Sequence, residues 1–174
     1  MNSLKNIYNT IIPTNINYTY SIMKKNILSL KKLYPFLEIL NIGNSVLGKH
    51  IPCIKFGNGK NEVFYSASIH ANEWITSVIL MKFIEDISNS YENNDFIFGI
   101  PAKNIFSYSS IYICPMVNPD GVDLVNEAIS KDSIIYNRVK NISNNFPAID
   151  FPNGWKANIR GVDFKNYQPF CKVL

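Results

Sequence analysis

Residues 62–88 carry the sequence EVFYSASIHANEWITSVILMKFIEDIS. The first part of this stretch, 62–69, is rich in apolar and aromatic residues and predicts a buried β-strand that leads directly into His70. The part at 72–88 has the length and the apolar periodicity of an α-helix. His70 is therefore expected at the junction between a strand and a helix.

Similar patterns extend in both directions along the chain. Residues 109–117 (SSIYICPMV) are almost continuously apolar, as in a buried central strand, and Asn118-Pro119-Asp120-Gly121 predicts a turn directly after them. Residues 155–170 give no clear pattern. The remaining predicted elements are a helix from Thr19 to the Tyr34-Pro35 pair, strands at 36–42 and 51–56 with a turn at Gly43-Asn44-Ser45, a hairpin turn at Gly57–Lys60, a loop or short helix at 89–104, a partly helical segment at 122–140 and a loop at 141–154.

Strands that alternate with helices predict an α/β fold whose sheet is covered by helices on both faces. In open sheets of this kind, ligands bind in the crevice beyond the carboxyl ends of the strands. The two predicted strands at 62–69 and 109–117 end at His70 and at the Asn118–Gly121 turn. We therefore expect the functional site at this edge of the sheet.

The overall composition excludes several classes of function. The 174 residues are 47% hydrophobic with a formal net charge of +4, which suits one globular domain. Lys and Arg form no dense stripe, so we expect no nucleic-acid partner. No apolar run approaches the roughly 18 residues of a membrane helix, and the N-terminus lacks the apolar centre of a secretory signal. The three cysteines, Cys53, Cys114 and Cys171, are far apart and odd in number, which favours a reducing compartment and a cytoplasmic location.

The most informative local feature is the His70-Ala71-Asn72-Glu73 segment. An imidazole and a carboxylate three residues apart, at the entry to a helix, can point at one spot. Catalytic zinc is commonly held by two His and one Glu, with water in the fourth position. The segment also has a structural interpretation, in which His70 ends the strand and Glu73 interacts favourably with the first turn of the helix.

Three segments in this order resemble the zinc carboxypeptidase family: HANEWIT at 70–76, PMVNPDGVDLV at 115–125 and NGWKANIRGVDF at 153–164. The resemblance is strongest to the bacterial γ-D-glutamyl-diamino acid peptidases, which act on peptidoglycan stem peptides, and it extends over residues 18–164. It implies a zinc-dependent metallopeptidase with a three-layer α/β/α mixed sheet. Residues 1–17 would form an irregular N-terminal segment, and residues 18–174 would be the N-terminal part of the catalytic domain.

The resemblance assigns His70 and Glu73 as two zinc ligands. Arg160 is the first candidate for the cation that binds the polarised carbonyl oxygen, because a guanidinium donates two hydrogen bonds to an oxyanion or carboxylate. Lys156 is an alternative, since the short WKANIRG segment aligns ambiguously. Each of these cations can also be a solvated surface charge. We expect Asn118 and Asp120 to shape their turn rather than contact substrate.

The chain departs from the family pattern at two places. The family continues from Gly-Val-Asp into Leu-Asn-Arg-Asn-Phe, whose Asn binds the terminal carboxylate, but here Phe164, Lys165, Asn166 and Tyr167 follow Asp163. Lys165 and Asn166 are the candidate substitutes for substrate binding. The family's third zinc ligand (a His), a substrate-contacting Tyr and a general-base Glu belong to a later part of its pattern, whereas this chain ends at Leu174. His50, the other histidine, is expected at the surface.

We therefore expect a C-terminally truncated metallopeptidase that is inactive alone and associates with itself through an exposed sheet edge. Three alternatives stay open: a pseudoenzyme fragment that binds a peptide or partner chain, a zinc hydrolase of the aspartoacylase or succinylglutamate desuccinylase type, and a purely structural α/β domain. The substrate can be a diaminopimelate-containing peptide or an ordinary C-terminus.

Overall fold

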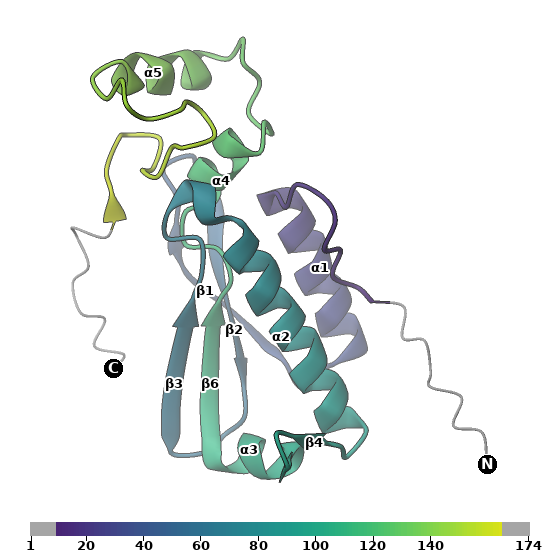
Figure 1. Ribbon diagram of the computed structural model, residues 1–174. Coiled ribbons are helices and arrows are strands. Elements are labelled where there is room, and N and C mark those ends of the chain that lie inside the picture. Colours follow the sequence, from purple (N-terminus) through teal and green to yellow (C-terminus); the bar gives the residue numbers. More distant parts are fainter. Residues whose placement is uncertain (1–9, 165–174) are drawn as a thin grey trace.

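A mixed four-stranded β-sheet forms the centre of the fold in the computed structural model, which describes residues 10–164 (Figure 1). Its strands are β1 (Glu38–Asn44), β2 (His50–Phe56), β3 (Asn61–Ser66) and β6 (Ser109–Cys114), in the spatial order β1-β2-β6-β3. β1 and β2 are antiparallel, as are β2 and β6, whereas β3 runs parallel to β6. The predicted α/β class and the central position of the 109–117 strand are confirmed.

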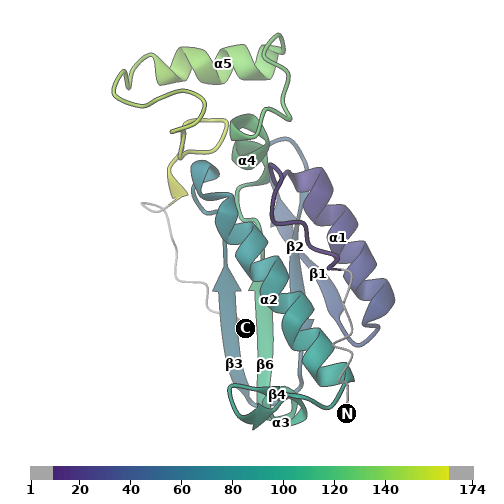
Figure 2. The same cartoon turned by 45° about the vertical axis from the view of Figure 1, so that its right-hand side comes forward.

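Two long helices, α1 (Tyr20–Leu33) and α2 (Ile75–Glu92), lie side by side on one face of the sheet (Figures 1 and 2). The Thr19 side chain caps the start of α1. The helix ends at Leu33, directly before the predicted Tyr34-Pro35 pair. The periodic apolar residues of both helices, such as Leu30 and Met81, are fully buried against Ile113 and neighbouring sheet residues. None of the helices in residues 10–164 has the length and apolarity needed to cross a bilayer.

The opposite face of the sheet is not crossed by a helix from residues 10–164 (Figures 1 and 2). Tyr65 packs its ring against Phe83 of α2, so Phe64, the preceding residue in β3, points to this opposite face. The side chain of Phe64 is 45% exposed, and Leu40 of β1, which also points there, is 38% exposed.

The predicted hairpin turn at Gly57–Lys60 is wrong, because β6 lies between β2 and β3. Instead, Gly57 and Gly59 pass close to the backbone of residues 106–109, where a Cβ on either glycine would collide with main-chain atoms. The N–H of Asn58 donates to the carbonyl of Phe106 at 3.0 Å. The glycines thus permit a close backbone crossing rather than a hairpin.

The predicted turn at Asn118–Gly121 is also wrong, since these residues begin helix α4 (Pro119–Val125). The Asn118 side chain accepts a hydrogen bond from the N–H of Gly121 at 3.1 Å and so acts as an N-cap. The 89–104 region holds the end of α2, a two-stranded sheet of β4 (Phe96–Ile97) and β5 (Ile100–Pro101), and the first residues of helix α3 (Ala102–Tyr108). Helix α5 (Ile134–Ser143) confirms that 122–140 is helical in part.

A second, smaller core lies at the end of the molecule that carries α4 and α5 (Figure 1). Trp155 and Val139 are buried in it, together with Ala71, the residue that follows His70. Trp74 packs against this core and against the main one. The second core therefore supports the strand-to-helix junction from the side opposite to the sheet.

Candidate metal centre

His70 and Glu73 lie beyond the carboxyl end of β3, as the sequence predicted. The chain stays beside β6 after the strand ends, because the Ala67 N–H donates to the Cys114 carbonyl and the Asn118 N–H donates to the Ser68 carbonyl, both at 3.0 Å. His70 then precedes a short 3₁₀ turn, η1 (Ala71–Glu73). This turn brings Glu73 back toward His70.

The His70 imidazole lies between two carboxylates. Its Nδ1 is 2.9 Å from Oε1 of Glu73, and its Nε2 is 3.3 Å from Oδ1 of Asp163. Nε2 is buried and, within residues 10–164, makes no hydrogen bond of good geometry. The Asp163 carboxylate is nevertheless close enough to interact with it electrostatically. Asp163 comes from the segment after α5, far along the chain from His70.

These contacts fit a metal site. A histidine that holds its proton on Nε2 beside a carboxylate presents the lone pair of Nδ1, which here faces the Glu73 oxygen. Two such electron-pair donors at 2.9 Å need a proton or a cation between them, and both are ordinary zinc ligands. Among the residues that the structure describes, no group of three or more His, Cys, Asp and Glu side chains could hold a metal. The assignment of His70 and Glu73 as zinc ligands stays a prediction.

The predicted cations lie on the docking loop, residues 156–163, which contacts His70 and Ala71. The N–H of Ala71 donates to the Lys156 carbonyl at 2.9 Å, and the Asn158 side chain accepts from the N–H groups of Arg160 and Val162. Lys156 and Asp163 line a common hollow of about 160 Å³. Arg160 is exposed and is not part of this lining. In residues 10–164 neither cation forms an ion pair, and their roles stay predictions.

Asn118 and Asp120 hold chain segments together. The Asn118 side-chain amide donates to the carbonyl of Ala157 at 3.2 Å, which fastens α4 to the docking loop. Asp120 is buried, accepts from the N–H of Leu47 at 2.9 Å and lies 3.1 Å from Nζ of Lys49. Both residues therefore have a structural use, but at the start of α4 rather than in the predicted turn.

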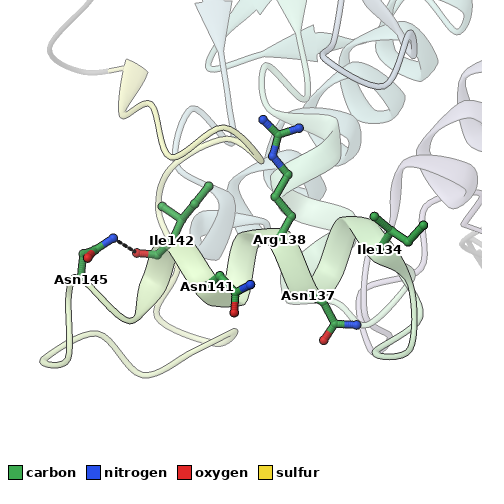
Figure 3. A pocket seen from close by; sticks show the side chains of 6 residues that line it. All are labelled: Ile134, Asn137, Arg138, Asn141, Ile142 and Asn145. Carbon is green, nitrogen blue, oxygen red and sulfur yellow. Dashed lines mark hydrogen bonds between the residues drawn. The ribbon is translucent and has the colours of Figure 1, made fainter.

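The other predicted residues lie elsewhere. His50 is exposed, as expected, and its Nδ1 is 2.7 Å from the Asn41 side-chain nitrogen. Lys165 and Asn166 lie outside the described residues. A hollow of about 570 Å³ runs along α5 (Figure 3) and contains none of the predicted site residues; its lining is Ile134, Asn137, Arg138, Asn141, Ile142 and Asn145.

Sequence reasoning missed the part played by Asp163. The residue belongs to the Gly161-Val162-Asp163 motif that contributed to the resemblance, so the motif was a signal, but no pattern pairs it with a histidine so far upstream. The second core and the docking loop create this contact, and both depend on residues that are distant in sequence.

The family model described as zinc carboxypeptidase matches residues 23–171. The chain belongs to the zinc carboxypeptidase family. Members of this family are zinc-dependent, which agrees with the donor atoms that meet at His70 and Glu73.

Two curated relatives match most of this zinc carboxypeptidase-family chain. It is 43% identical over 159 residues to gamma-D-glutamyl-L-diamino acid endopeptidase 1 of Lysinibacillus sphaericus, covering 88% of this chain and 38% of the relative. It is 35% identical over 154 residues to the uncharacterized protein YqgT of Bacillus subtilis, covering 87% of this chain and 40% of the relative. The chain thus spans about two fifths of the length of these relatives.

A solved structure supports the fold. The structure of bovine thrombin-activatable fibrinolysis inhibitor, in complex with tick carboxypeptidase inhibitor, superposes with a TM-score of 0.55 at 21% identity. The match covers 81% of this chain and 36% of that chain.

Proposed function

We propose that this chain is the N-terminal part of a zinc-dependent peptidase that cleaves γ-D-glutamyl-diamino acid bonds, as found in peptidoglycan stem peptides. The observation that carries the proposal is the convergence of His70 Nδ1 on Glu73 Oε1, with the Asp163 carboxylate behind the ring. The proposed bond is the one named for the Lysinibacillus relative, which is 43% identical over 88% of this chain.

Zinc bound here would polarise a carbonyl and lower the pKa of a coordinated water. His70 and Glu73 would hold the metal through Nδ1 and Oε1. Asp163 would keep the proton on Nε2 and fix the orientation of the ring, as carboxylates do behind metal-bound histidines. Lys156 or Arg160, on the docking loop, would donate hydrogen bonds to the oxygen on which negative charge develops.

Zinc binding to the purified chain, measured by calorimetry, tests the proposal. We expect binding of one equivalent that is lost in both His70→Ala and Glu73→Ala. His50→Ala is the matched control, because His50 is exposed and contacts Asn41 rather than the pair. Binding that persists in both ligand variants would contradict the assignment.

We also propose that the chain by itself does not hydrolyse peptides, since residues 10–164 offer no third converging metal ligand. The same observation favours a second candidate function, in which the chain binds a peptide or partner without turnover. A γ-D-glutamyl-diaminopimelate peptide separates the two: release of the diamino acid identifies the enzyme, whereas measurable affinity without product identifies the binding fragment. N-acyl amino acids test the remaining hydrolase alternative in the same assay.

A further inference from the structure

Three hydroxyl groups lie directly behind the candidate metal ligands, between the end of β3 and the start of α2. Ser68 Oγ is 2.6 Å from Ser77 Oγ, and both of these residues are buried. The Ser68 N–H donates to Thr76 Oγ1 at 2.9 Å. The hydroxyls therefore join the segment before His70 to the first turn of α2.

Two of these hydroxyls, those of Ser68 and Thr76, also bind the backbone of Glu73. The Glu73 carbonyl accepts from Thr76 Oγ1 at 2.7 Å and from Ser68 Oγ at 3.3 Å. One proton arrangement satisfies the four contacts of 3.3 Å or less: Ser77 donates to Ser68, Ser68 and Thr76 donate to Glu73, and Thr76 accepts from the Ser68 N–H. A longer contact of 3.5 Å joins Ser68 Oγ and Thr76 Oγ1.

The backbone of Ser68 explains why such a network is needed. Its φ is +48°, a left-handed conformation that is unfavourable for residues other than glycine and that persists only when the surroundings impose it. Here the Ser68 N–H, hydroxyl and carbonyl are all engaged, the carbonyl by the Asn118 N–H at 3.0 Å. This bend redirects the chain from β3 into the turn that carries His70 and Glu73.

We propose that Ser68, Thr76 and Ser77 form a hydroxyl clamp that positions the His70–Glu73 pair for metal binding. The inference rests on the proposed zinc site and adds positioning residues that contact neither metal nor substrate. The clamp fixes the bend two residues before His70 and the carbonyl of Glu73 itself. It thereby limits the relative movement of two ligands whose side chains are partly exposed.

The test uses the full 174-residue chain and first omits metal. The chain has two histidines, so ring nitrogen NMR signals report His70 directly and His50 serves as an internal reference. Thr76→Val removes the hydroxyl at nearly constant shape, and Thr76→Ser restores it. Ser88→Ala is the matched control, because Ser88 is another buried α2 serine whose Oγ has no hydrogen-bond partner in the described part of the chain.

We expect Thr76→Val to shift the His70 signals and leave those of His50 in place, whereas Thr76→Ser and Ser88→Ala retain the wild-type spectrum. Zinc affinity should fall about tenfold in Thr76→Val, the usual size for groups that orient metal ligands. Ser77→Ala provides a second variant with the same expected direction if Thr76→Val does not fold.

The outcomes separate the clamp from the zinc site. If Thr76→Val shifts the His70 NMR signals but the wild-type chain binds no zinc, the clamp is supported and the proposed function is contradicted. The clamp would be overturned by a different result. In that result zinc binding depends on Glu73, but Thr76→Val and Ser77→Ala bind zinc as strongly as Ser88→Ala and leave the His70 signals unchanged.

Discussion

At the scale of single residues, the contact of His70 with Asp163 leads to a testable prediction about metal binding. A carboxylate behind a metal-bound histidine fixes the tautomer and the direction of the ring, and removing such a group typically costs 10- to 100-fold in affinity. In this chain the Nε2–Oδ1 distance is 3.3 Å, and the residue that supplies the oxygen is held by the docking loop.

We therefore expect Asp163→Ala to weaken zinc binding by about 10- to 100-fold, measured by calorimetry. Asp132→Ala is the control, since Asp132 is exposed and belongs to the segment before α5. Equal affinities in the two variants would show that Asp163 does not orient His70.

How much of the site the sequence can predict depends on the separation of its parts. His70 and Glu73 are three residues apart, so a local pattern is enough to place them together. Asp163 reaches His70, and the Lys156 carbonyl reaches the Ala71 N–H, through tertiary packing of α5 and Trp155, which no local pattern contains. Ser68 was missed because its left-handed backbone is imposed by Thr76, Ser77 and Asn118 rather than encoded by a glycine.

At the scale of elements, two ionic contacts tie the secondary structure together. Glu85 of α2 binds the segment before α1: its carboxylate accepts from the Ile11 N–H at 2.6 Å, from Thr10 Oγ1 at 2.9 Å and from Lys82 at 2.8 Å. Burial raises the pKa of the Glu85 carboxyl, but the hydrogen bonds from Lys82, Ile11 and Thr10 outweigh it and hold the pKa below its ordinary value.

Because the pKa of Glu85 is lower in the folded chain than in the unfolded chain, its stabilising effect exists above the unfolded value of 4.5 and disappears as pH falls through the folded value. We expect Glu85→Gln to lower the unfolding free energy by about 1–2 kcal/mol at pH 7. The difference from wild type should shrink in denaturant titrations below pH 4.5. The control is Asp86→Asn, which changes an exposed partner of the same Lys82 and should alter the unfolding free energy by less than about 0.5 kcal/mol. If the difference in unfolding free energy between wild type and Glu85→Gln did not depend on pH, the ionised Glu85 carboxylate would not be its cause.

The second contact is Lys49, which follows the β1–β2 turn and pairs with two acidic residues of α4. Its Nζ lies 3.1 Å from Asp120 and 2.7 Å from Asp123, whose side chains are 2% and 10% exposed. Asp123 also accepts the N–H of Tyr20 at 2.8 Å, so the first turn of α1 joins the same group.

Lys49→Met should therefore destabilise the chain by about 3 kcal/mol, since it leaves two buried carboxylates without their cation. Chemical denaturation checks this value. Lys55→Met is the control, because Lys55 pairs at 3.4 Å with a Glu38 side chain that is 58% exposed, and it should cost less than about 1 kcal/mol. Similar losses in both variants would contradict a special role for Lys49.

The same scale shows where sequence patterns fail for the fold. The helices and the strand bodies follow from local periodicity, but the position of β6 between β2 and β3 does not. Gly57 and Gly59 gave the local signal of a hairpin, although their use is to let the backbone pass beneath the end of α3.

At the scale of the whole molecule, β3 pairs with β6 along one side, and within residues 10–164 no strand pairs with its other side. Aromatic side chains of β3 are exposed on both faces of this edge: Phe64 on one face and Tyr65 on the other are each 45% exposed. An unpaired edge with apolar neighbours favours pairing with another chain.

We therefore expect the chain to associate with itself as concentration rises, as measured by sedimentation velocity. Phe64→Lys should favour the monomer, because a charge on an edge strand opposes pairing. Phe98→Lys is the control: Phe98 is 98% exposed, but it lies between β4 and β5. A monomer at all concentrations, or equal effects of both substitutions, would exclude association through β3.

The dependence of the His70 turn on Lys156 and Trp155 also sets an order of events during synthesis. The ribosome adds roughly 5–20 residues per second, so the docking loop emerges on the order of ten seconds after the turn that it supports. During that interval the Ala71 N–H lacks the Lys156 carbonyl as its acceptor, and Trp74 lacks the part of the second core that contains Trp155. Translation thus delivers the sheet and its long helices first, and the ligand pair becomes fixed only when the late segment closes over it.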